Sequence, residues 1–131
     1  LKRWQKKLNI PINFNPKYFP PSNVEKASCL ILSNKEPQIQ NKLSFSLFKS
    51  MWLEEKDIGD ENTLSEICQS HGLDYKEASK QASGFTDMYN SLAEQAASLN
   101  VFGSPSYVLN DEVFWGQDRL DLLEEVILNN K

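Results

Sequence analysis

The spacing of apolar residues changes after Asn100, and this change constrains the fold more than any other feature of the 131-residue sequence. Before it, apolar residues recur at the three- or four-residue spacing of a helix. After it, residues 107–109 and 112–115 have strand composition and flank Asn110-Asp111, a dipeptide typical of a tight turn. Residues 119–128 return to helical spacing. The sequence therefore predicts a helical block followed by a β-β-α unit.

The helical block is predicted to contain several short helices. Residues 1–8 have the pattern of the end of a helix, and residues 9–22 form a loop rich in proline and aromatic residues, which excludes regular structure. Further helices are expected from residue 24 after a cap at Asn23, over about 37–54, from Asp60 or Asn62 to His71-Gly72, over 75–82 after Asp74, and from Thr86. Their short connectors favour a compact helical bundle.

The longest predicted helix, 37–54, carries too many apolar residues for one stripe, so we expect it to be buried on more than one side. Its members are Ile39, Leu43, Phe45, Leu47, Phe48, Met51, Trp52 and Leu53.

Charge and composition exclude some functions. The net charge of −4 disfavours nucleic acid as a partner, and no apolar run approaches the length that spans a bilayer. Cys29 and Cys68 lie far apart without a CxxC motif, so we expect two buried thiols and a reducing, cytoplasmic location. The sequence has no cluster of His, Cys and acidic residues that suggests a metal site, so we predict none. The start has no leader pattern and no Met, so we expect a piece of a longer protein.

The segment "VFGSPSYVLNDEVFWGQDRLDLLE", residues 101–124, resembles the C-terminal half of a thioredoxin-like fold of the DsbA type. It is most similar to the branch that contains 2-hydroxychromene-2-carboxylate isomerase and kappa-class glutathione transferase. Residues 1–11, 19–27 and 47–58 resemble other motifs of that branch. The resemblance implies an α/β fold, mostly α in this chain, with a helical insertion domain at 1–100 and a C-terminal β-β-α half-domain at 101–131.

The resemblance also implies an N-terminal β-α-β unit, which precedes the helical insertion in this branch and carries a catalytic serine or a cysteine pair. The sequence from Leu1 does not include it, so we assign no catalytic residue here. A hairpin without the neighbouring strands would have bare edges, and we expect the chain to self-associate or to pair with such a unit. Members of these families are usually homodimers.

The resemblance further implies a glutathione site at Ser104, Pro105, Gln117 and Asp118. A cis Ser104-Pro105 bond would expose the backbone of Ser104 to the cysteinyl part of glutathione, whereas the alternative is an ordinary trans proline entering an edge strand. The helix start at Gln117-Asp118 would hold the γ-glutamyl end of glutathione. Backbone N–H groups would bind its carboxylate, and Asp118 would bind its ammonium group. The alternative is that Asp118 only caps the helix.

A pocket for an aromatic substrate is assigned to Asn23, Trp52, Phe102 and Trp115. Core packing is the alternative for both tryptophans, and helix capping explains Asn23 by itself. His71 is expected to be a surface residue at a helix end.

Several functions remain open at this point. The first is a glutathione-dependent isomerase that interconverts cis and trans forms of an aromatic catabolite. The same site could serve a kappa-type glutathione transferase, and an upstream CxxC would instead favour a DsbA-like thiol-disulfide oxidoreductase. A non-catalytic fragment or interaction domain is a further alternative. We expect this chain alone to be inactive and to bind glutathione weakly or not at all.

Overall fold

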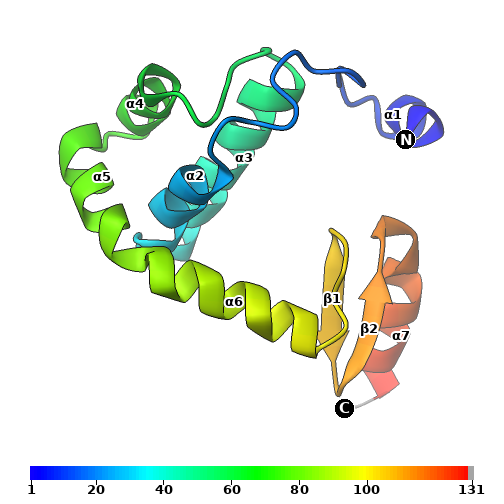
Figure 1. Cartoon of the computed structure of the whole chain (residues 1–131). Coiled ribbons are helices and arrows are strands. Elements are labelled where there is room, and N and C mark those ends of the chain that lie inside the picture. The colour runs from blue at the N-terminus through cyan, green and yellow to red at the C-terminus, as the bar shows by residue number, and fades with distance from the viewer. Residues whose placement is uncertain (130–131) are drawn as a thin grey trace. The chain divides into compact units, whose positions relative to one another are not determined.

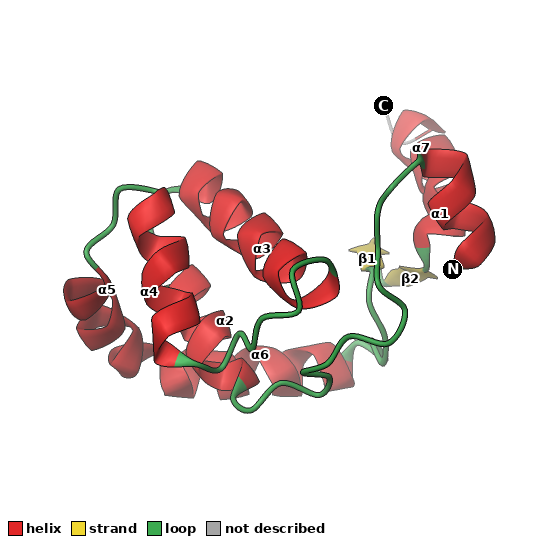
Figure 2. Cartoon of the chain, turned by 90° about the horizontal axis from the view of Figure 1, so that it is seen from above, coloured by secondary structure: helices red, strands yellow, loops and turns green. Residues whose placement is uncertain are grey.

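The computed structural model describes residues 1–129, which form seven α-helices, two 3-10 turns and one two-stranded sheet (Figures 1 and 2). The chain divides into two compact units, Leu1–Tyr89 and the part from Asn90 onward. The first contains α1 (Lys2–Leu8), α2 (Val24–Leu32), α3 (Pro37–Trp52), α4 (Glu61–Ser70), α5 (Tyr75–Ala82), η1 (Ser83–Phe85) and the start of α6 (Thr86–Ser98). The second contains the rest of α6, β1 (Ser106–Leu109), β2 (Glu112–Trp115), η2 (Gln117–Arg119) and α7 (Leu120–Asn129).

The helix starts confirm the capping predictions. The side chain of Asn23 accepts a hydrogen bond from the N–H of Lys26 at 3.0 Å, and Asp74 likewise caps α5. Of the two candidates for α4, Asp60 is the cap, with its carboxylate 3.0 Å from the N–H of Thr63. These side chains satisfy N–H groups that have no partner within the helix, so they fix where each helix begins.

The core of the first unit lies between α2, α3, α4 and α5. Leu43, Leu64 and Cys68 are its largest fully buried side chains. Cys29 is also buried, at 4% exposure, so the prediction of two buried free thiols is confirmed. Helix α1 buries no residue, and the compact bundle is therefore formed by the later helices.

The prediction that α3 is buried on more than one side is wrong. Leu43, Leu47 and Met51 face the core, whereas Phe45 and Phe48 are 72% and 62% exposed. The spacing of apolar residues shows which face of a helix is apolar, but it does not show whether another element covers that face. Within the described part of the unit, one face of α3 is covered and the face with these phenylalanines is open.

The proline-rich loop before α2 is held against the unit by specific contacts. The ring of Phe19 lies 5.2 Å from that of Trp52, and the N–H of Asn13 donates to the carbonyl of Trp52 at 2.7 Å. Asp57 accepts from the N–H groups of Ser22, at 3.2 Å, and of Gly59, at 2.9 Å. The predicted loop at 9–22 is thus confirmed as irregular and packed, and its Phe19–Pro20 bond is cis.

The second unit is built on the predicted hairpin. β1 and β2 pair antiparallel with Tyr107 opposite Phe114. Asn110 and Asp111, the two turn residues, have φ of 52° and 64°, the conformation of a tight hairpin turn. Helix α7 packs on β2, and Phe114 is buried at 4% exposure. The opposite face of the hairpin carries Val108, which is 41% exposed.

The division between the compact units falls inside α6, because this helix continues from the first unit into the second. The boundary predicted between the two domains lies after Asn100, where the spacing of apolar residues changes along the sequence, and not inside α6. The assignment of residues 1–100 to a helical insertion domain and 101–131 to a half-domain stays a prediction, and its last two residues lie outside the described part. None of the helices within residues 1–129 combines the length and apolarity needed to cross a membrane.

The Asp57 contacts predict a pH-dependent contribution to stability. Burial acts to raise the pKa of Asp57, but hydrogen bonds from the N–H of Gly59 and from Ser22 outweigh it, so the pKa lies below its usual value. A lowered carboxyl pKa stabilises the fold at neutral pH, and this stability is lost as pH falls through the folded-state pKa. Asp57→Ala should cost about 1–2 kcal/mol in urea unfolding at pH 7. The loss of unfolding free energy caused by Asp57→Ala should become smaller as the pH is lowered through the pKa of Asp57 in the folded state. Glu94→Ala, on an exposed part of α6, is the control, and equal losses in both variants would contradict the assignment.

Candidate functional site

The loop before β1 and the turn after β2 are joined by one backbone hydrogen bond. The N–H of Gly116 donates to the carbonyl of Pro105 at 2.9 Å. The hydroxyl of Ser106 donates to the carbonyl of Gly103 at 2.6 Å, which closes the loop on itself. Because the hairpin places its two ends side by side, the predicted pairs Ser104-Pro105 and Gln117-Asp118 come together at one end of the sheet. This is the candidate site of the second unit.

The Ser104-Pro105 peptide bond is cis, as expected from the resemblance, and the trans alternative is wrong. Ser104 is exposed, and Pro105 leads directly into β1. No hydrogen bond joins the backbone N–H or C=O of Ser104 to another residue of the described part of the chain. The assignment of Ser104 and Pro105 to glutathione binding stays a prediction.

Gln117 and Asp118 lie in the 3-10 turn η2, which precedes α7, so the predicted helix start is a tighter turn. Gly116 has a φ of 103°, which favours glycine, and a Cβ there would lie 2.5 Å from Oδ1 of Asp118. The carboxylate therefore folds back over Gly116. Both side chains are exposed, and no side chain makes a capping hydrogen bond at the start of η2. The Asp118 side chain therefore does not cap the helix, and its carboxylate is available to a cationic group.

Trp115 lies beside the loop, and its predicted alternative of core packing is wrong because the side chain is 67% exposed. Its indole rests on Gly103, where a Cβ would lie 2.5 Å from Nε1. A tryptophan at the end of an edge strand can contact a neighbouring loop without entering the core. Phe102, next to Gly103 in sequence, is 80% exposed. Two large apolar side chains thus accompany the exposed Ser104.

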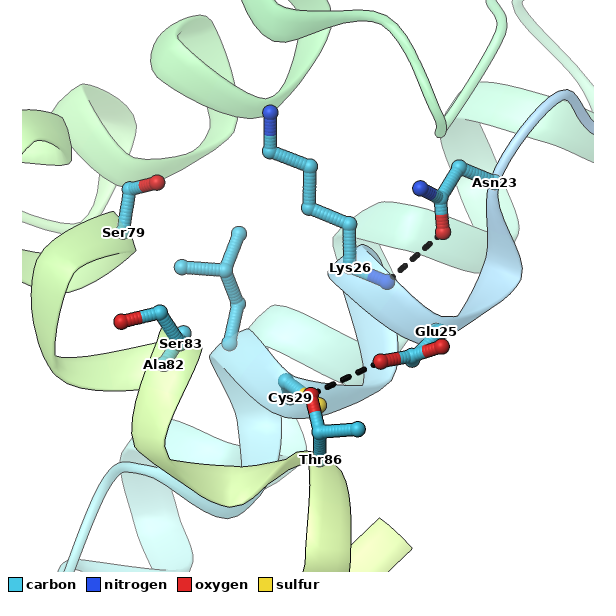
Figure 3. Close-up of a pocket in the computed structure, with 9 residues that line it drawn as sticks. Asn23, Glu25, Lys26, Cys29, Ser79, Ala82, Ser83 and Thr86 are labelled. Atoms are coloured by element: carbon cyan, nitrogen blue, oxygen red, sulfur yellow. Dashed lines mark hydrogen bonds between the residues drawn. The ribbon is translucent and has the colours of Figure 1, made fainter. Parts of the chain in front are cut away.

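Asn23 and Trp52 belong to the first unit and line different cavities. Asn23 borders a cavity of about 230 Å³ between α2, α5 and the start of α6, with both polar and apolar residues in its wall (Figure 3). Figure 3 also shows the hydrogen bond from Thr86 to Glu25, at 2.8 Å, beside the thiol of Cys29. The capping role of Asn23 is confirmed, whereas its role in a substrate pocket stays a prediction.

Trp52 is partly buried and packs against the core and against Phe19. It also lines an apolar cavity of about 410 Å³ between α2 and α3. Core packing and a place in a cavity wall therefore both hold for this residue.

Neither cysteine has the environment of a nucleophile. Burial raises the pKa of Cys29, and the charge of Glu25 raises it further. Burial raises the pKa of Cys68 as well. Both groups remain protonated thiols at neutral pH, which is the less reactive form. The assignment of no catalytic residue to this chain stays a prediction.

Sequence reasoning missed three features of these sites. The Gly116–Pro105 hydrogen bond and the Phe19–Trp52 contact join residues far apart in sequence, and no local pattern reveals them. The hydroxyl of Ser46 and Nε2 of His71 lie 2.8 Å apart, so His71 links α3 to the end of α4 and is only partly exposed. Among residues 1–129, no three His, Cys, Asp or Glu side chains gather in a way that could hold a metal ion.

The order of elements and the loop-turn site define a thioredoxin-like protein of the DsbA type. The DSBA-like thioredoxin domain family matches residues 1–128, and the chain belongs to that family. A solved structure of 2-hydroxychromene-2-carboxylate isomerase superposes with a TM-score of 0.80 over 98% of this chain and 62% of that one, at 23% identity. At this identity the likeness shows the fold, and it confirms the predicted fold class.

Two relatives carry the same name. The 2-hydroxychromene-2-carboxylate isomerase of Sphingobium xenophagum is 30% identical over 132 residues, covering 98% of this chain and 65% of that protein. The enzyme of that name from Pseudomonas putida is 27% identical, covering 97% of this chain and 62% of that protein. The expected resemblance to this branch is thus confirmed. The chain spans less than two thirds of the length of either relative.

The packing of Trp115 on Gly103 predicts that Gly103→Ala displaces the indole. The new methyl group would overlap Nε1, so the tryptophan must move, and because this side chain is exposed the change in stability should be small, about 0.5 kcal/mol. In an NMR spectrum the indole N–H signal of Trp115 should shift while those of Trp4 and Trp52 stay. Gly84→Ala is the matched control, since nothing lies within 4 Å of the added Cβ. An unchanged Trp115 signal in Gly103→Ala would contradict the contact.

Proposed function

We propose that the protein containing this chain is a glutathione-dependent isomerase of the 2-hydroxychromene-2-carboxylate type. Membership of the DSBA-like thioredoxin domain family and two isomerase relatives support this class. The substrate is then a small aromatic catabolite whose cis and trans forms are interconverted. A homodimer and a cytoplasmic location belong to the same proposal.

The hydrogen bond between Gly116 and Pro105 is the observation that carries the proposal. It holds two kinds of binding group at one end of the hairpin: the exposed backbone at Ser104, and the exposed amide and carboxylate of Gln117 and Asp118. An extended peptide can pair with the first by strand addition. An amino-acid end group, with its carboxylate and ammonium, fits the second. These residues therefore fit a γ-glutamyl tripeptide.

In this scheme glutathione supplies a thiol that adds reversibly to a conjugated double bond and so allows rotation about it. The residues of this chain bind and orient the tripeptide. The Ser104 backbone holds the cysteinyl residue, the Gln117 amide and nearby N–H groups hold the carboxylate, and Asp118 holds the ammonium. The resemblance implies that the group that lowers the thiol pKa lies in the N-terminal β-α-β unit, and the buried, protonated Cys29 and Cys68 do not supply a thiolate of their own. The chain alone is then inactive.

A kappa-type glutathione transferase is the alternative that uses the same binding groups with an electrophile that stays attached. A DsbA-like oxidoreductase would require a cysteine pair from another part of the protein, because this chain has only two cysteines and both are buried. The exposed Asp118 favours a glutathione enzyme over the oxidoreductase, which has no γ-glutamyl group to hold.

The proposal predicts a specific defect in Asp118→Asn. Loss of the charge-assisted hydrogen bond to the ammonium should raise the KM for glutathione about 10- to 100-fold. The kcat at saturating glutathione should change far less, because the carboxylate contacts a remote part of the tripeptide. Steady-state kinetics with 2-hydroxychromene-2-carboxylate measure both constants in the protein extended to the length of its relatives.

Asp121→Asn in the first turn of α7 is the matched control, as an exposed aspartate close by in sequence. It should leave both constants near the wild-type values. An isomerase whose rate does not depend on glutathione, or an unchanged KM in Asp118→Asn, would exclude this site.

A further inference from the structure

Gly103, in the loop before β1, is held from two directions. The hydroxyl of the partly buried Ser106 donates to its carbonyl at 2.6 Å. The indole of Trp115 lies against its backbone, where an added Cβ would come within 2.5 Å of Nε1, 2.8 Å of Cε2 and 3.0 Å of Cζ2. One residue of the loop is thus fixed by a hydrogen bond on one side and by an aromatic ring on another.

The register of the hairpin explains why these two side chains meet at Gly103. Ser106 is the first residue of β1 and lies opposite Trp115, the last residue of β2. Directly opposite residues of an antiparallel pair have their side chains on the same face of the sheet. The hydroxyl and the indole therefore leave the sheet together. A serine hydroxyl that bonds a carbonyl three residues earlier then closes a tight loop.

Ser104 lies between two fixed residues and is itself free of hydrogen bonds. Gly103 precedes it, and Pro105 follows it with its carbonyl bonded to the N–H of Gly116 at 2.9 Å. Neither the backbone nor the hydroxyl of the exposed Ser104 makes a hydrogen bond within residues 1–129. The loop is therefore held on both sides of Ser104, while the polar groups of Ser104 stay open.

This arrangement affects the free energy of binding. A loop that is ordered before the ligand arrives loses less conformational entropy on binding than a loop that must become ordered. Under the proposed function, the backbone of Ser104 pairs with the cysteinyl residue of glutathione. The hydroxyl of Ser106 is already bonded to Gly103, so it acts on the tripeptide only through the loop.

We propose that Ser106 is a positioning residue of the glutathione site. Its hydroxyl, together with the indole of Trp115, fixes Gly103 and so holds the backbone of Ser104 in the conformation that glutathione binds. The inference rests on the proposed function and adds to it a residue that does not touch the ligand.

Steady-state kinetics with 2-hydroxychromene-2-carboxylate, in the protein extended to the length of its relatives, test the proposal. Ser106→Ala should raise the KM for glutathione about 3- to 10-fold, since one hydrogen bond that orders the loop is lost. The kcat at saturating glutathione should stay within about twofold, because the bound tripeptide orders the loop itself. Ser106→Thr retains a hydroxyl and should restore the KM.

Ser98→Ala is the matched control, because the hydroxyl of Ser98 on α6 also donates to a carbonyl three residues earlier, that of Gln95, at 2.8 Å. It should leave both constants near the wild-type values. Should Ser106→Ala fail to fold, Ser106→Val against Ser106→Thr makes the same comparison at matched shape, since β-branched residues suit a strand.

The ordering of the loop is measured separately, by NMR relaxation of the isotope-labelled chain without glutathione. The amides of Gly103 and Ser104 should become more mobile in Ser106→Ala and stay as in wild type in Ser98→Ala. Unchanged mobility, an unchanged KM in Ser106→Ala, or a raised KM that Ser106→Thr does not restore would each overturn the proposal. A raised KM in Asp118→Asn with an unchanged KM in Ser106→Ala would overturn this inference alone and leave the proposed function standing. An isomerase that does not depend on glutathione would overturn both.

Discussion

One hydrogen bond, from the N–H of Gly116 to the carbonyl of Pro105, organises the candidate site of this protein. Each partner occupies an unusual backbone position, a cis peptide bond before Pro105 and a φ of 103° at Gly116. The hairpin between them supplies the antiparallel register that brings the two positions together. The exposed Ser104, Gln117 and Asp118 all lie within two residues of this bond, and their relative placement depends on it.

The distribution of exposed apolar side chains indicates surfaces that a longer protein could cover. Phe45 and Phe48 on α3 and Val108 and Trp115 on the hairpin are apolar yet exposed. The relatives are longer than this chain, which spans 65% and 62% of their lengths. Pairing of the hairpin with a β-α-β unit of the kind implied by the resemblance stays a prediction, which rests on the open hydrogen-bonding groups of an unpaired strand.

The sequence predicted the features that depend on local chemistry. Caps at Asn23, Asp60 and Asp74, the Asn110-Asp111 turn and the buried thiols follow from short-range patterns. The burial of α3 and Trp115 was predicted wrongly, because exposure depends on which elements lie opposite. The site residues came from resemblance to a family. The structure brings Pro105 and Gly116 together through a backbone hydrogen bond between residues eleven apart, which no local pattern in the sequence reveals.

The central claim is that the loop and the turn joined by the Gly116–Pro105 bond act as one binding wall for glutathione. An NMR titration of the isotope-labelled chain with glutathione at millimolar concentration tests it directly, since such concentrations reveal weak binding. We expect the amide signals of Ser104, Gly116, Gln117 and Asp118 to shift together along one binding curve, while those of α4 and α5 stay fixed. Shifts confined to other residues, or different curves for the loop and the turn, would contradict it.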